Sequence, residues 1–326
     1  MSMDVEAIPG GGVAPTTPGA AAGGAPAATP SSSRWGDVAR QVLRSWSGRI
    51  GLVLATLIIG MAVLAPLIAP YEPNQVLLSP EHGQVKEKPC VHVFNCSEDK
   101  HQHLMGLDEN GRDEFSRIVY GARISLLAGG AAVGLAVVVG TMIGLISGFY
   151  SRWLDNVLMR CMDVLLSFPS LLLAILIVTV LGRGLVNSIL AISIVYVPVY
   201  ARVVRGQVLA LRDQDFVTAD RALGVKDVRI LLHRVFPNAL TPLVVQATLG
   251  FATAVIEIAG LGFLGLGVQP PEAEWGTMIS LAYRSILNAP HLVLFPGILI
   301  FLNVLAFNLL GDALRDALDP RSERRA

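Results

Sequence analysis

The side chains that could perform chemistry are few, and their spacing argues against an energy-coupling site within this chain. The four lysines are Lys86, Lys88, Lys100 and Lys226, and none of them follows a glycine. A phosphate-cradling loop of the G-x-x-x-x-G-K-[ST] type requires a lysine directly after a glycine, because the ammonium and the loop N–H groups bind the nucleotide phosphates together. We therefore expect no nucleotide hydrolysis and no cofactor in this chain.

Hydrolytic motifs are also missing from the sequence. There is no G-x-S-x-G turn to expose a nucleophilic serine and no H-E-x-x-H array to hold zinc. His233 and His291 fall in different polar segments. These observations disfavour a membrane enzyme.

A cluster of cysteine and histidine lies in one polar segment and comprises Cys90, His92, Cys96, His101 and His103. In an oxidising compartment, Cys90 and Cys96 are expected to form a small disulfide loop. A zinc site built from the same residues is the alternative, since these side chains are its usual ligands. Mass spectrometry with and without reductant distinguishes a bridged pair from thiols that carry metal.

The elements that position these groups are predicted to be membrane-spanning helices. The sequence is 53% hydrophobic and 15% charged, with a mean hydropathy of +0.58, and six runs reach the ~20 apolar residues that a spanning helix needs. Helices are expected because lipid leaves backbone groups no other partners. The runs are Ile50 to Ala69, Ser125 to Tyr150, Leu158 to Leu181, Val186 to Val204, Ala239 to Leu264 and Leu292 to Leu310.

The basic residues predict the orientation of these spans. If the amino terminus is cytoplasmic, seventeen of the 25 Lys and Arg lie inside and eight lie on or near the outside, as the positive-inside rule favours. Both termini are then cytoplasmic. The inside set is Arg34, Arg40, Arg44, Arg49, Arg152, Arg160, Arg202, Arg205, Arg212, Arg221, Lys226, Arg229, Arg234, Arg315, Arg321, Arg324 and Arg325.

The span limits divide the chain into segments. Residues 1–33 are mostly Ala, Gly, Pro, Thr and Ser with no apolar stretch, so we expect a disordered cytoplasmic tail rather than a signal peptide. Residues 34–69 hold the first span, 70–121 form a long outside loop, 122–313 form the core, and 314–326 form a second cytoplasmic tail. The net charge of zero suggests no binding to nucleic acid.

The second span is rich in glycine, with Gly129, Gly130, Gly134, Gly140, Gly144 and Gly148. Small residues at spacings of three or four allow helix backbones to approach closely in lipid. Tight packing inside the subunit is the favoured interpretation, and a face that lines a pathway is the alternative.

The cytoplasmic segment 205–237 is too charged to span and too regular to be a linker. Gly224 can adopt the left-handed conformation that closes one helix, Asp227 can open the next, and Pro237 fits the first turn of the fifth span. The prediction is two short helices at an angle that expose basic and apolar groups. Insertion into a groove of a soluble partner is favoured, and an amphipathic helix on anionic lipid is the alternative.

These residues resemble a known family. The stretch TADRALGVKDVRILLHRVFP is similar to the EAA loop of binding-protein-dependent ABC importer permeases, with Thr218, Ala219 and Asp220 at the triplet. Thr218 and Asp220 depart from Glu-Ala-Ala, while the spacing to the glycine and proline is intact. The resemblance assigns the ATPase-coupling role to Thr218, Ala219, Asp220, Ala222, Leu223, Gly224, Val225 and Pro237.

The resemblance extends over roughly residues 35–322. HLMGLDENGRDEFSRIVYGARISL, MDVLLSFPSLLLAI, LGFLGLGVQPPEAEWG and FPGILIFLNVLAFNLLGDALRDALDPR resemble the C-type subunit of dipeptide and oligopeptide importers, a group that includes nickel importers. It implies an all-α type I importer fold in a prokaryotic inner membrane. It also implies a homologous B-type permease, two ATPase subunits that bind ATP and Mg²⁺, a substrate-binding protein and a peptide substrate.

Three polar residues lie inside or beside apolar runs, where an unpaired polar side chain has a high free-energy cost. Glu257 could pair with a partner subunit, line the pathway or bind the amino group of a peptide, and Asp163 is expected near the cytoplasmic mouth beside Arg160. Asn303 is expected to hydrogen-bond between helices, and contact with the substrate in the pathway is the alternative. A secondary transporter is the rival class, although no inverted repeat of the kind such folds show is evident.

Overall fold

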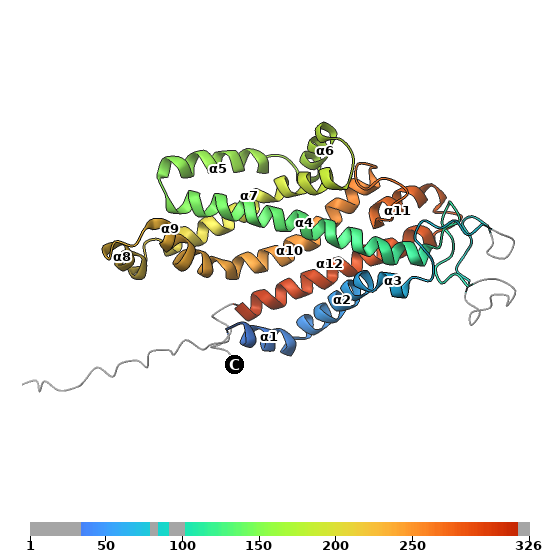
Figure 1. Cartoon of the computed structure of the whole chain (residues 1–326), viewed down its shortest axis with the longest axis horizontal. Coiled ribbons are helices and arrows are strands. Elements are labelled where there is room, and N and C mark those ends of the chain that lie inside the picture. Colours follow the sequence, from blue (N-terminus) through green and yellow to red (C-terminus); the bar gives the residue numbers. More distant parts are fainter. Residues whose placement is uncertain (1–33, 79–83, 91–101, 319–326) are drawn as a thin grey trace, which may run out of the picture.

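A computed structural model describes residues 34–78, 84–90 and 102–318 (Figure 1). Within these ranges the chain is helical, and its extended pairings are isolated bridges of Cys90 with His103 and of Leu107 with Asp113. The all-α prediction is therefore confirmed. The helices are α1 (Arg34–Arg44), α2 (Trp46–Val63), α3 (Ala65–Ile68), α4 (Glu114–Phe149), α5 (Arg152–Leu166), α6 (Ser170–Leu181), α7 (Leu185–Leu211), α8 (Asp215–Ala222), α9 (Asp227–Ile230), the π-helical turn η2 (Leu231–Val235), α10 (Phe236–Phe263), α11 (Trp275–Ala282), the 3₁₀ turn η3 (Tyr283–Ser285) and α12 (His291–Leu318).

Six helical units correspond to the six predicted spans. Five helices are long and apolar enough to cross a membrane, namely α2, α4, α7, the run from α9 to the end of α10, and α12. The sixth unit is α5 and α6 together, which are bent by 94° at a short break. The predicted tail 1–33 and residues 319–326 lie outside the described residues.

The third span differs from its prediction, because Leu158 to Leu181 is not one straight helix. Proline disfavours helical geometry at the residue before it and removes a backbone donor, and Pro169 ends α5 in this way. The Ser167 hydroxyl donates to the Val164 carbonyl at 2.6 Å in the last turn of α5. Helix α6 then starts at Ser170 in a new direction (Figure 1).

Other boundaries also differ from the predicted ones. Helix α4 starts at Glu114, inside the predicted loop 70–121, because Asp113 caps it by accepting from the Ser116 N–H at 2.8 Å. Helix α12 runs to Leu318, past residue 313. Helices α1 and α11 had not been predicted, since neither is long enough to give a spanning signal.

The most extensive packing among the described helices is between α4 and α7. A Cβ atom built on Gly140 would lie 2.7 Å from the Val197 carbonyl oxygen, and one on Gly144 would lie 2.5 Å from the Ala201 carbonyl oxygen. Gly148 meets Val208 in the same way. These glycines bring two backbones together, so the packing interpretation of the glycine-rich span is confirmed for this part of α4.

The two ends of the bundle carry different structures (Figure 1). At one end, called the elbow end, α8 and α9 project beyond the tips of α4, α7 and α10. At the opposite end, called the loop end, the described parts of the long loop meet α11 and the start of α4. The spanning helices separate these two ends.

Candidate functional site

The elbow consists of α8, Gly224 and α9, and its turn is closed by backbone hydrogen bonds. Gly224 has φ of +78°, its N–H donates to the Arg221 carbonyl at 2.9 Å, and the Val225 N–H donates to the Asp220 carbonyl at 3.0 Å. This double pattern is the Schellman motif, which needs a left-handed residue at the glycine position. The predicted conformation of Gly224 is therefore confirmed.

Ion pairs fasten α8 to the helix that follows it. Arg234 on η2 contacts Asp220 on α8 at 2.9 Å, and Arg221 contacts Asp227 at 3.4 Å. The Arg221 guanidinium also lies 5.0 Å from the ring centre of Phe149, at the end of α4. These contacts fasten α8 to the helical segment after it and to the end of α4.

The second arm of the elbow is continuous with the fifth span, which corrects the prediction of two separate short helices. Helix α9 begins at Asp227 as predicted and passes through η2 directly into α10. Pro237 lies in the first turn of α10, also as predicted. Since proline has no N–H to donate inside a helix, the wider π turn next to it is a local accommodation.

Some apolar side chains of the elbow are buried against the bundle, and others are exposed. Val217 and Ile230 are fully buried against the bundle core. In contrast, Leu223 is 81% exposed and Val228 is 56% exposed. Exposed apolar side chains that gather on a rigid, projecting element are typical of an interaction surface.

The predicted coupling residues are mostly brought together on this surface. Thr218, Ala219, Ala222, Leu223 and Gly224 are exposed, while Asp220 and Val225 are half-buried beneath them. Pro237 is exposed but lies along the second arm, at the start of α10.

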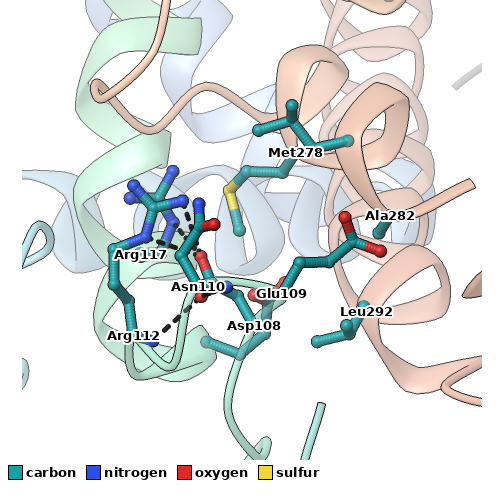
Figure 2. Close-up of a pocket in the computed structure, with 10 residues that line it drawn as sticks. Asp108, Glu109, Asn110, Arg112, Arg117, Met278, Ala282 and Leu292 are labelled. Carbon is teal, nitrogen blue, oxygen red and sulfur yellow. Dashed lines mark hydrogen bonds and ion pairs between the residues drawn. The ribbon is translucent and has the colours of Figure 1, made fainter. Parts of the chain in front are cut away.

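At the loop end, two arginines converge on Asp108, as Figure 2 shows. Arg112 donates through Nε and Nη2 to Asp108 Oδ2 at 2.7 Å, and Arg117 Nε lies 3.4 Å from the same oxygen. Arg117 Nη1 also donates to the Pro73 carbonyl at 2.9 Å and to the Pro271 carbonyl at 3.2 Å. This hub joins three loop segments that are distant in sequence, and the sequence analysis had not identified it.

A small cavity of about 90 Å³ adjoins the hub and is closed on its other side by α11 and α12. Glu109 projects toward Ala282 and Leu292 there (Figure 2), and its Oε1 accepts from the Ser285 hydroxyl at 2.5 Å. Burial and the nearby Asp113 carboxylate raise the pKa of Tyr71 in the same loop region. The long loop is therefore folded onto the bundle at this end.

Helix α11 is capped and anchored by buried polar contacts. Glu274 accepts from the N–H groups of Gly276 and Thr277, both at 2.9 Å, and from the Ser125 hydroxyl of α4 at 3.2 Å. Trp275 is fully buried, and its Nε1 donates to the Ile118 carbonyl at 3.1 Å. These contacts hold α11 against α4 and α10.

Removing the cap by Glu274→Ala is expected to destabilise the protein by about 0.5–2 kcal/mol, the usual range for a lost N-cap. The N–H groups of Gly276 and Thr277 would lose their acceptor. Thermal unfolding in detergent measures the change, and Glu272→Ala is the control because Glu272 is exposed nearby. Equal melting temperatures for the two variants would contradict the capping role.

The three polar residues predicted within the membrane lie at separate places. Asp163 on α5 is paired with Arg202 of α7 at 2.6 Å, so its predicted neighbour Arg160 is not the partner that it binds. The reason is that α5 faces α7, which a sequence neighbour could not reveal. Asn303 on α12 is fully buried, and neither of its amide atoms has a partner among the described residues, so the expected interhelical hydrogen bond is not formed.

Glu257 on α10 is half-buried. The hydroxyls of Ser170 and Tyr196 lie near its carboxyl group. One carboxylate oxygen, Oε2, is buried with no hydrogen-bond partner in the described part of the chain.

The cysteine and histidine cluster is only partly described. Cys90 is disulfide-bonded, Cys161 is a free exposed cysteine, and Cys96 lies outside the described residues. His103 contacts Asp113 at 3.0 Å. A bridged sulfur is no zinc thiolate, and no metal-binding group of three His, Cys, Asp or Glu occurs among the residues described. These observations favour the disulfide over zinc.

Comparison with known proteins identifies the class to which this fold and elbow belong, that of multi-pass transport permeases. Residues 140–324 match the family described as binding-protein-dependent transport system inner membrane component. Residues 33–83 match the N-terminal transmembrane domain of oligopeptide transport permease C. The chain therefore belongs to the inner membrane component family of binding-protein-dependent transport systems.

Curated relatives cover nearly the whole chain. The dipeptide transport system permease protein DppC of Alkalihalophilus pseudofirmus is 45% identical over 89% of this chain and 90% of its own length. The di/tripeptide permease protein DppC of Pseudomonas aeruginosa is 44% identical over 85% of this chain and 88% of its own. The glutathione permease protein GsiD of Escherichia coli is 41% identical over 88% and 90%.

Among solved structures, the inward-facing MetNI methionine ABC transporter shares the fold. It superposes with a TM-score of 0.52 at 20% identity, covering 62% of this chain and 96% of the matched chain. The predicted importer-permease fold is therefore confirmed. As a permease of an ABC importer, the chain works with a partner permease, ATPase subunits and a binding protein.

Proposed function

We propose that this chain forms one half of the membrane pathway of a peptide importer driven by ATP hydrolysis in separate subunits. The observation that carries the proposal is the 45% identity, over most of both chains, to a dipeptide permease. The substrate would be a dipeptide or a short peptide, delivered by a binding protein that selects it. Nickel and other small solutes are the competing cargoes.

The elbow is the part that would receive the ATPase movement. It carries the exposed apolar side chains Leu223 and Val228 on either side of a turn that hydrogen bonds and an ion pair hold in place. A rigid apolar helix suits insertion into a groove of a soluble partner. Because the second arm continues into α10, a push on the elbow would reach the spanning helices directly.

The elbow end would be cytoplasmic and the loop end extracytoplasmic. The excess of Arg and Lys at the elbow end supports this orientation. The disulfide-bonded Cys90 of the long loop supports it too, because such bonds persist in oxidising compartments. Both termini would then be cytoplasmic, and the hub would face the binding protein.

Reconstitution tests the proposal. The full complex, with its partner permease, both ATPases and binding protein, should import labelled dipeptide into proteoliposomes only when ATP is present on the ATPase side. Import of nickel but not of dipeptide would contradict the assignment of a peptide as the substrate. Uptake driven by an ion gradient through this chain alone would instead indicate a secondary transporter.

A further inference from the structure

One face of α10 carries polar residues along the length of the helix. Asn238, Gln246, Thr253 and Glu257 lie within an arc of about 100°, since successive residues turn by about 100°. None of the four is buried in the described structure, whereas Leu243, Ala254 and Ile258 on the rest of the helix are buried. From Asn238 to Glu257 the helix rises roughly 28 Å, close to the ~30 Å thickness of the hydrocarbon core.

A groove occupies the elbow-end half of this face. It has a volume of about 550 Å³ and lies between α7, α10 and α12. Gln207, Asn238, Thr241 and Gln246 supply uncharged donors and acceptors to its lining, and Arg315 supplies the charge. Pro242 also lines it and lacks the N–H that would normally donate to the Asn238 carbonyl one turn earlier. Neutral amides and hydroxyls suit a polar solute in transit.

Glu257 lies beyond this groove, toward the loop end, and lacks a positive partner. Its neighbours Ser170 and Tyr196 offer hydroxyls, which carry no charge. No ion pair to Glu257 is formed within the described residues, whereas Asp163 and Asp155 on α5 are both paired with arginines. Ionisable residues within membrane-spanning helices often mark the path of a substrate or ion. A cationic partner for Glu257 is therefore to be sought outside the described chain.

We infer that the polar face of α10 lines the solute pathway and that Glu257 binds the cationic amino group of the transported solute. The inference rests on the proposed function, because a short peptide carries such a group at its amino terminus. An ammonium donating to the Glu257 carboxylate would form a charge-assisted hydrogen bond, stronger than the bonds that hydroxyls provide. The groove toward Arg315 would then receive the solute after it leaves this carboxylate.

Two substitutions at Glu257 distinguish the effect of its charge from the effect of its side-chain length and neutral hydrogen bonds. Glu257→Asp keeps the charge, whereas Glu257→Gln keeps the length and can still hydrogen-bond to Ser170 and Tyr196. In the reconstituted complex we expect Glu257→Gln to lower dipeptide import per ATP hydrolysed by roughly tenfold, the loss expected for a charged hydrogen bond, and Glu257→Asp to retain more import than Glu257→Gln.

The outcomes distinguish the inference from the proposed function. If the wild-type complex imports dipeptide and Glu257→Gln transports at least as well as Glu257→Asp, the inference is wrong and the proposed function stands. Failure of Glu257→Gln to co-purify with the partner permease would also overturn it, since Glu257 would then be a subunit contact. Absence of dipeptide import by the wild type refutes the proposed function itself.

Thiol labelling tests the pathway face independently. In a Cys161→Ser background, Thr253→Cys should react with a charged, membrane-impermeant thiol reagent in the assembled complex, and excess dipeptide should slow the reaction. Val138→Cys is the control, because Val138 is 58% exposed on an apolar part of α4 that lipid is expected to cover. Equal labelling of Thr253→Cys and Val138→Cys would overturn the assignment of this face.

Discussion

Gly144→Val is expected to destabilise the bundle strongly, because α4 and α7 touch through their backbones at this point. A Cβ on Gly144 would lie 2.5 Å from the Ala201 carbonyl oxygen, 2.8 Å from Val204 Cβ and 3.0 Å from the Arg205 N atom. Two of these atoms are backbone and cannot rotate away. We expect a loss of about 3 kcal/mol or more, at the upper end for overpacked cores. Yield of monodisperse protein in detergent and its melting temperature measure the loss.

Gly134→Val is the matched control for this substitution. Gly134 lies on the same helix, and a Cβ there meets no atom within 4 Å. The loss of a glycine and the added side chain are the same in both variants, so a difference between them reports the contact with α7. If the two variants melt at the same temperature, α4 and α7 do not pack through Gly144 as described.

Gly224→Val is expected to uncouple ATP hydrolysis from import while leaving the bundle folded. Gly224 has φ of +78° and open space around it, so the substitution creates strain without a clash. A left-handed conformation costs an L-residue about 2 kcal/mol, which lowers the population of the turn roughly thirtyfold. The elbow would then lose its fixed angle, and we expect import per ATP to fall roughly tenfold or more.

Gly206→Val controls for the added side chain near the elbow. A Cβ on Gly206 also meets nothing within 4 Å, and its backbone is helical at the end of α7. Valine fits that conformation at a cost of only about 0.5 kcal/mol or less relative to alanine. Full coupling in Gly224→Val would show that the elbow angle is not needed to transmit the movement.

The spanning helices were predictable because their signal is local. A run such as that from Leu185 to Leu211 is too apolar to be stable in water and is expected in lipid. In lipid, a helix satisfies all of its backbone hydrogen bonds internally. The elbow turn was predictable for the same reason, since Gly224 caps α8 through residues at most four positions away.

The bend of the third span shows a partly local signal that was missed. Pro169 and the preceding Phe168 mark a helix break, yet the apolar residues on either side dominate an average over the whole run. Helix α11 was missed because its eight residues are stabilised by Ser125 and Ile118, which lie some 150 positions away in the chain.

By itself the sequence determined that this chain is a helical membrane protein with an elbow closed at Gly224 and no nucleotide-binding loop. Those properties depend on composition and on neighbours within a few turns of helix. Only the tertiary structure decided that Arg112 and Arg117 share Asp108, that Arg202 pairs with Asp163, and that Glu257 has no ion pair among the described residues. A charged side chain takes its partner from whichever element packs beside it, and that neighbour is fixed by the fold rather than by position along the chain.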